Sequence, residues 1–203
     1  MYLLLPLNTT TATYVSARHA LLVVLLALPL LPELEGWHAK AVRVAAALAA
    51  TVGLVAVGRH LVCFDGEARD FDGVLARMEP ARRVLPMVFA RSGACVAPKM
   101  FPYLHFAAYY QAAEGGELAR SFAVVWNVPI RYRADYRRYP IREEIEWAPS
   151  QITPEDARHF DYALVRGGPP RLSPQLGMQL LAHSGAWTLY ENPDALPPDL
   201  PTP

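Results

Sequence analysis

The residues best suited to chemistry are a histidine and a tyrosine four positions apart. His105 and Tyr109 lie in an aromatic segment at residues 101–113, and Lys99 stands just before it. Four-residue spacing places two side chains on one face of a helix. An imidazole there could accept a proton or bind a sugar hydroxyl, with the tyrosine ring as a stacking surface. The alternative, which the aromatic composition favours, is a core helix with a hydrogen-bonded histidine.

A second group of candidate residues is acidic and aromatic. Glu143, Glu144 and Glu146 are followed directly by Trp147. Carboxylates beside an indole suit carbohydrate binding, and two carboxyl groups at the right separation could serve glycosidic chemistry. The sequence does not determine that separation. A solvent-exposed run of charges explains the same residues and is the favoured interpretation.

A third group of candidate residues is basic and interleaved with tyrosines. Its members are Arg131, Arg133, Arg137 and Arg138, with Tyr132, Tyr136 and Tyr139 between and after them. Guanidinium groups bind phosphate through paired hydrogen bonds, so this segment could hold the phosphate of a lipid carrier or an anionic headgroup. Ion pairs with the neighbouring glutamates explain it equally well.

These patterns predict a binding surface but no catalytic, metal or cofactor site. The candidate ligand-binding residues are Lys99, His105, Tyr109, Arg131, Arg133, Glu143, Glu146 and Trp147. No serine stands in a nucleophile context, and no glycine-rich phosphate loop follows a predicted strand. Equal numbers of basic and acidic residues, 19 of each, leave no electrostatic footprint for nucleic acid, which we exclude as a partner.

The elements that must position these residues follow the order of an α/β sheet. The apolar spacing predicts three helices, at residues 64–78, 101–113 and 174–181, the last with Leu176, Leu180 and Leu181 buried. Short apolar runs predict four strands, at residues 84–89, 121–132, 160–165 and 186–190, and residues 132–149 are predicted to form a long loop. Pro86 indicates an edge position or a bulge in the first strand. Strands alternating with helices predict a small open α/β sheet.

The first sixty residues have the composition of membrane spans. Residues 20–32 and 44–58 contain no charged side chain. A helix needs about 20 apolar residues to cross a bilayer, and the flanking residues extend both runs toward that length. We therefore predict two transmembrane helices, at about residues 14–32 and 39–59, within a transmembrane region at 1–60. A soluble α/β domain at 61–191 and a proline-rich tail at 192–203 complete the predicted organisation.

The basic residues beside the predicted spans indicate the orientation. Lys40 and Arg43 lie near the turn that joins the two spans, while each outer flank offers one arginine. The positive-inside tendency then favours a cytoplasmic turn and an extracytoplasmic domain. In that compartment Cys63 and Cys95 could form a disulfide. Their lack of a spacing pattern favours two separate small apolar side chains instead.

Three segments, taken in order, carry a family resemblance. They are KMFPYLHFAAYYQ at residues 99–111, FDYALVRG at 160–167 and AWTLY at 186–190. Following two membrane spans, they resemble the C-terminal end of bacterial polytopic membrane proteins of the glycosyltransferase C superfamily type, described as dolichyl-phosphate-mannose mannosyltransferase-like. The resemblance covers nearly the whole chain, but it is one of composition and order and includes no catalytic motif.

The resemblance implies a location and a role. In that family a region of many membrane helices binds a lipid-linked sugar, and the essential acidic residue lies near the protein N-terminus, where this chain has no match. Residues 1–7 look like the end of an earlier helix, which suggests the tail of a larger protein. The implied location is the bacterial inner membrane with the domain in the periplasm.

Two functions follow as expectations. In the first, the chain is the extracytoplasmic domain of a glycosyltransferase-like protein, and it binds an acceptor or has a structural role without being catalytic alone. Its partners would be the bilayer and a polyprenyl-phosphate-linked sugar or a glycan acceptor. In the second, the chain is a membrane-anchored interaction module with no enzymatic activity.

Overall fold

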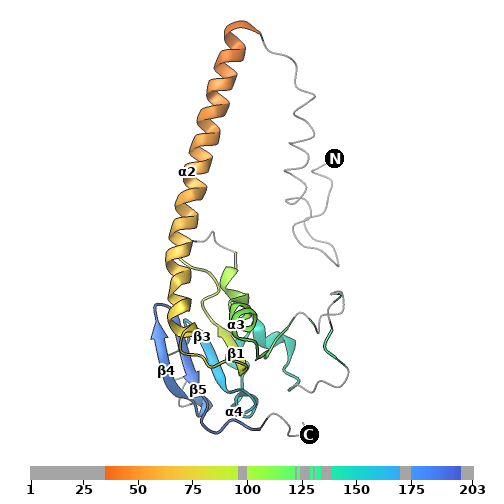
Figure 1. Ribbon diagram of the computed structural model, residues 1–203. Coiled ribbons are helices and arrows are strands. Elements are labelled where there is room, and N and C mark those ends of the chain that lie inside the picture. The colour runs from red at the N-terminus through yellow and green to blue at the C-terminus, as the bar shows by residue number, and fades with distance from the viewer. Residues whose placement is uncertain are drawn as a thin grey trace. The chain divides into compact units, whose positions relative to one another are not determined.

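The computed structural model describes residues 35–95, 100–121, 123, 129, 131–133, 139–169 and 175–197. The chain divides into two compact units, Met1–Val55 and Ala56–Pro203. Helix α2 (Gly36–Leu75) contributes residues to both units (Figure 1). The first predicted span, residues 14–32, lies outside the described residues.

Residues 44–58 of α2 are apolar on all sides. The 40 residues of α2 make the helix long and apolar enough, by length and composition, to cross a membrane. Within the uncharged stretch at residues 44–58, Val52 is 68% and Leu54 74% exposed, so no protein core surrounds these side chains. The predicted second span, residues 39–59, falls inside this helix.

The helix does not stop where the apolar stretch ends. We predicted a separate helix at residues 64–78, but α2 continues unbroken past Arg59 and ends at Leu75. Extending a helix adds one hydrogen bond per residue, whereas starting a new one is costly, and no proline interrupts this stretch. The N–H groups of Arg77 and Met78 bond to the carbonyls of Val74 and Leu75, three residues back, which closes the end of the helix.

The folded part is a mixed α/β structure around one open sheet. Its five strands are β1 (Arg83–Val88), β2 (Glu117–Leu118), β3 (Tyr162–Arg166), β4 (Gln179–Ser184) and β5 (Trp187–Glu191). Their order across the sheet is β2-β1-β3-β5-β4. β1 runs parallel to β2 and β3, while β5 runs antiparallel to β3 and β4. The predicted strands at 84–89, 160–165 and 186–190 are thus confirmed within one or two residues, and the one at 121–132 lies largely outside the described residues.

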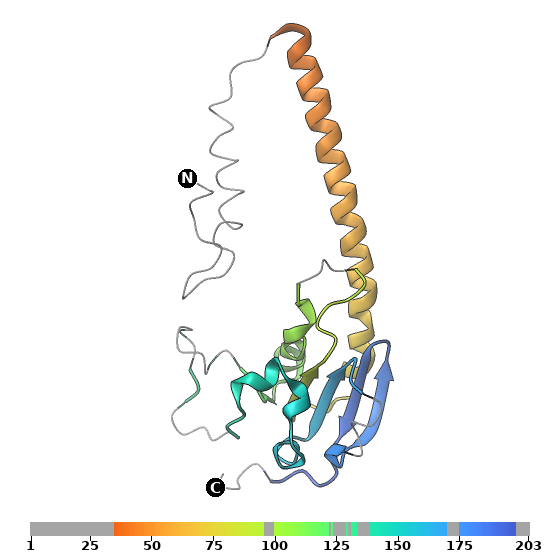
Figure 2. The same cartoon turned by 180° about the vertical axis from the view of Figure 1, so that it is seen from behind.

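The sheet separates two cores, because successive side chains of a strand point to opposite faces. On β1, Val84 and Val88 face a core shared with α2, the short helix η3 (Pro102–His105) and α3 (Ala107–Glu114). Leu85 and Met87 face the other core. That core is covered by the short helices η5 (Glu143–Glu146), η6 (Pro149–Gln151) and α4 (Pro154–Ala157) (Figure 2).

The predicted helix at residues 174–181 is wrong at its C-terminal end. Gln179–Ser184 is strand β4, and Leu180 and Leu181 are 63% and 40% exposed instead of buried. Gly177 has a positive φ of 70°, which ends any helix before this point. Gly185, also at positive φ, then makes the turn that pairs β4 with β5.

The predicted helix at residues 101–113 is two helices instead of one. The 3-10 helix η3 starts with Pro102, and α3 begins only after Phe106. The loop predicted at residues 132–149 contains the short helix η5 in its described part, and η6 begins at its last residue.

Pro86 lies where β1 passes the end of β2. β2 pairs with β1 only at Arg83 and Val84. Ala119 donates its N–H to the carbonyl of Val84, so this side of β1 faces β2. Pro86, two residues further on, presents its nitrogen to the same side, beyond the last paired residue, where the missing N–H removes no bond to β2.

Candidate functional site

A cavity of about 380 Å³ lies beside β1 just past the end of β2. This volume is in the range of small-molecule sites. The walls come from β1, η3, α3, the residues after β2, and η5. The described lining residues are Leu85, Pro86, Val88, Leu104, His105, Ala107, Ala108, Gln111, Leu118, Ala119, Arg120, Ser121, Ala123, Arg131, Tyr132, Ile141, Arg142, Ile145 and Glu146.

The polar centre of this cavity is the carboxylate of Glu146. Its Oε1 lies 3.2 Å from Nδ1 of His105, and its Oε2 lies 2.5 Å from Nη1 of Arg120. The Glu146 side chain is only 10% exposed, while those of His105 and Arg120 are 47% and 25% exposed. A nearly buried carboxylate therefore holds two partly exposed cationic or proton-binding groups in place.

Burial of the neighbouring residues explains how the three side chains come together. Leu104 and Phe106 are both 7% exposed and packed in the first core, so His105 between them is turned outward. Ile145 is packed in the second core and fixes Glu146 beside it. Arg120 lies two residues after the end of β2, directly after the buried Ala119.

The described charges around the cavity are mostly positive. Three arginines, Arg120, Arg131 and Arg142, line it against one glutamate, Glu146, which leaves a formal charge of +2 with His105 neutral. Most of the other lining residues are apolar. An apolar cavity with a positive rim suits a ligand that combines an apolar part with an anionic group.

The structure brings together three of the eight candidate residues at the cavity: His105, Arg131 and Glu146. Arg133 is described but is not among the lining residues. Lys99, Arg137 and Arg138 and the side chain of Glu143 lie outside the description.

Two aromatic candidates lie elsewhere. Tyr109 is 62% exposed, and its ring packs near Phe71 and Phe106. Trp147 is 48% exposed and packs against Phe101. Neither lines the cavity.

Sequence reasoning missed two arginines of the cavity, Arg120 and Arg142. Arg120 follows a strand of only two residues, β2, whose length gives no periodic signal. Arg142 stands alone before the glutamates; its Nη2 donates to the carbonyl of Gln151 at 3.1 Å. Only the folded chain shows that both reach the same cavity.

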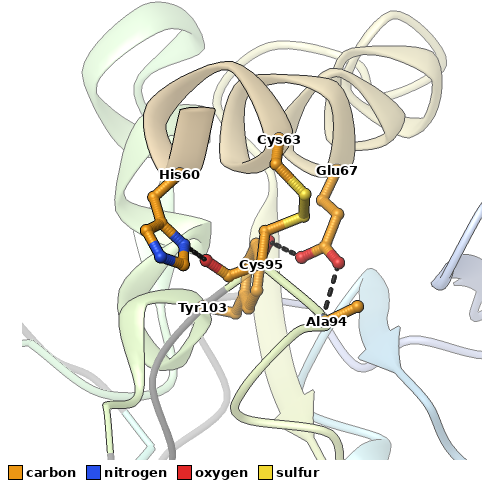
Figure 3. The surroundings of a disulfide bond; sticks show 6 residues. All are labelled: His60, Cys63, Glu67, Ala94, Cys95 and Tyr103. Atoms are coloured by element: carbon orange, nitrogen blue, oxygen red, sulfur yellow. Dashed lines mark hydrogen bonds between the residues drawn. A yellow bond between two sulfur atoms is a disulfide. The ribbon is translucent and has the colours of Figure 1, made fainter. Parts of the chain in front are cut away.

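A second polar cluster ties α2 to the sheet domain (Figure 3). Cys63 and Cys95 form a disulfide with a Cα–Cα distance of 5.5 Å, so the favoured interpretation as separate side chains is wrong. His60 Nδ1 lies 3.3 Å from the Cys95 carbonyl oxygen. Glu67 accepts hydrogen bonds from the Tyr103 hydroxyl at 2.6 Å and the Ala94 N–H at 2.7 Å. Residues 60, 63 and 67 share one face of the helix.

The ionisable groups of this cluster are hydrogen-bonded to each other and to the backbone, which indicates a role in stability. The hydrogen bond from Tyr103 lowers the pKa of Glu67, with burial opposing it and the bonds from Ala94 and Cys95 adding to it. Burial, together with the hydrogen bond to Glu67, raises the pKa of Tyr103 far above its ordinary value. Arg166 lies 3.6 Å over the Tyr103 ring and donates to the Ser92 carbonyl at 2.8 Å. The cluster is a structural joint, and the cavity is the candidate ligand site.

Comparison of the chain with protein-family models, with curated proteins and with solved structures finds no match in any of the three. Within the residues that the structure describes, no three His, Cys, Asp or Glu side chains come together in a group that could hold a metal ion.

Proposed function

We propose that the chain is a membrane-anchored extracytoplasmic domain of a glycosyltransferase-like membrane protein, and that its cavity binds the acceptor or the lipid-linked sugar without catalysing transfer alone. The observation that carries the proposal is the Glu146 carboxylate, held between His105 and Arg120 in the wall of an apolar cavity. The family part of the proposal rests on the sequence resemblance.

The disulfide supports the extracytoplasmic location. Cys63 lies four residues after Arg59, the first charged residue beyond the apolar stretch of α2. Disulfides form and persist in oxidising compartments and are rare in the cytoplasm. A bond between Cys63 and Cys95 therefore agrees with the orientation that the basic residues favour.

The lining of the cavity supports a ligand with an isoprenoid-like part and a phosphate. The apolar walls suit hydrocarbon, and the guanidinium groups suit a phosphate oxygen. Both oxygens of Glu146 are already paired, so its role is to orient His105 and Arg120 toward the ligand.

The test is the binding of geranyl phosphate to the full chain in lipid nanodiscs, measured by titration calorimetry. We expect saturable binding by the unaltered chain and weaker binding of geraniol, which lacks the phosphate. Arg120→Ala should weaken geranyl phosphate binding by about 10- to 100-fold, the range for loss of one hydrogen bond to a charged group.

The matched control is Arg158→Ala, because Arg158 is an exposed arginine outside the cavity, 3.9 Å from Glu155. We expect no change in binding. Equal weakening by both substitutions, or equal binding of geraniol, would contradict a phosphate site in the cavity.

One observation favours the second function, an interaction module. β4 is an outer strand of the described sheet, and its Leu180 and Leu181 are 63% and 40% exposed. Exposed strand edges with apolar side chains can pair with a partner chain. Absence of geranyl phosphate binding in the unaltered chain would make this the better account.

A further inference from the structure

An exposed aromatic patch on the domain belongs neither to a core nor to the cavity. Met100, Phe101 and Trp147 are 60%, 41% and 48% exposed. The rings of Phe101 and Trp147 meet edge to face with centroids 5.9 Å apart, although the residues are far apart in sequence. The guanidinium carbon of Arg91 lies 5.1 Å from the Trp147 ring centroid. Apolar side chains gathered in this way from separate segments usually mark an interaction surface.

The distance of this patch from the membrane can be estimated along α2, starting at Arg59, where the uncharged stretch ends. The helix rises about 6 Å over the four residues from Arg59 to Cys63. The headgroup layer adds about 5–8 Å on each side of a hydrocarbon core of roughly 30 Å. Cys63, and with it Cys95, is therefore at the level of the headgroups.

The first residue of the patch, Met100, lies five residues beyond Cys95 in the sequence. Tyr103, two residues after Phe101, donates a hydrogen bond to Glu67, which lies one turn of α2 beyond Cys63.

We propose that Met100, Phe101 and Trp147 dock the domain onto the surface of the bilayer, with Arg91 beside them toward lipid phosphates. Tryptophan and other aromatic rings favour the membrane interface because one end is apolar and the other polar. A basic residue near an anionic lipid surface adds electrostatic attraction. The inference rests on α2 crossing the membrane, as in the proposed function.

Tyr109 provides an internal comparison for the patch. It is 62% exposed, yet its ring packs near Phe71, twelve residues beyond Arg59 on α2. That distance is about 18 Å along the helix, outside the headgroup layer. An equally exposed aromatic residue should therefore stay away from lipid.

The experiment reconstitutes the full chain in vesicles of phosphatidylcholine and phosphatidylglycerol that contain a lipid with a photoreactive diazirine near its headgroup. Labelled peptides are mapped by mass spectrometry after illumination. We expect labelling of Met100, Phe101 and Trp147 together with α2, and none of Tyr109. Labelled α2 with an unlabelled patch would overturn the docking inference alone, whereas unlabelled α2 would overturn the membrane anchor as well.

A double variant, Phe101→Ser with Trp147→Ser, tests the patch directly. Labelling at Met100 should fall at least fivefold while α2 stays labelled. Tyr109→Ser, the matched control, should change nothing. The Cys63–Cys95 bond, read as a mobility shift on reduction, reports that each variant is folded. Unchanged labelling of Met100 in the folded double variant would overturn the inference.

Discussion

The two halves of α2 are one continuous helix in two different environments. Residues 44–58 are uncharged, and large side chains there are exposed, Leu54 to 74%. In the second half, Phe71 and Val74 are 3% and 0% exposed, while Asp72 lies on the outer face. The first half is apolar all round, as a lipid-facing helix is, and the second is apolar on one side, as a helix on a sheet is. Continuity of a helix therefore says little about what surrounds it.

Between the uncharged part and the sheet-packed part of α2, three residues make specific contacts with other segments of the chain. His60, Cys63 and Glu67 attach the helix to residues 94–95 and to Tyr103 through specific polar and covalent contacts. These directional contacts define where α2 joins the sheet domain, which the non-directional burial of apolar side chains alone would not do.

The largest expected effect comes from Phe71→Ala in the protein-facing half. Phe71 packs edge to face against Phe106 and Trp187, with centroids 5.5 Å and 5.1 Å away. Removal of a buried phenyl ring should lower the free energy of unfolding by about 3–5 kcal/mol. Chemical denaturation in detergent micelles, followed by tryptophan fluorescence, measures this change.

Leu54→Ala is the control in the uncharged part of α2. Leu54 touches no core, so the unfolding free energy of the domain should stay the same. Equal losses from the two substitutions would contradict the division of α2.

A somewhat smaller effect is expected when a charge enters the uncharged part of α2. Val52→Asp, with Val52 68% exposed, should make insertion of α2 less favourable by about 3 kcal/mol. Glycosylation sites engineered on either side of α2 report insertion in a microsomal assay. Gly66→Asp adds the same charge beyond the membrane, at a position with no atom within 4 Å of the new Cβ, and should insert normally. Normal insertion of Val52→Asp would show that residues 44–58 do not cross lipid.

The smallest expected effect concerns the joint. Glu67→Gln removes the charge and keeps only one of the two acceptor oxygens that bind Ala94 and Tyr103, so the domain should lose about 1 kcal/mol at pH 7. The folded-state pKa of Glu67 is lowered, so its contribution is present above the ordinary glutamate pKa of about 4.3 and is lost as the pH falls through the lower folded value. Unfolding of the two proteins, compared between pH 7 and pH 3, should show the difference shrinking on acidification. A difference that stays constant with pH would mean that the charge of Glu67 plays no part.

Much of the fold could be predicted because it depends on local pattern. The strands that include Leu85, Leu164 and Leu189 are short apolar runs bounded by turn residues, and the structure confirms all three. The helix expected at Leu180 is wrong because the four-residue spacing from Leu176 fits a helix, while pairing with β5 decides in favour of a strand. That pairing is a contact between chain segments, which spacing within one segment does not reveal.

The candidate site likewise combines residues that local patterns indicated with a residue that only the folded chain reveals. His105 and Glu146 were each recognisable as polar residues in aromatic surroundings. Their contact spans 41 residues and includes Arg120, which no local pattern singled out.

The sequence by itself determined which segments avoid water and with what periodicity, because solvation and helical or strand spacing act over a few neighbouring residues. The tertiary structure alone decided that Cys63 meets Cys95, that Glu146 joins His105 to Arg120, and that β2 ends beside Pro86 and leaves a cavity. Each of these contacts joins residues that are far apart in the chain. The chain entropy lost when such a loop closes is offset only when both cores of the sheet form together.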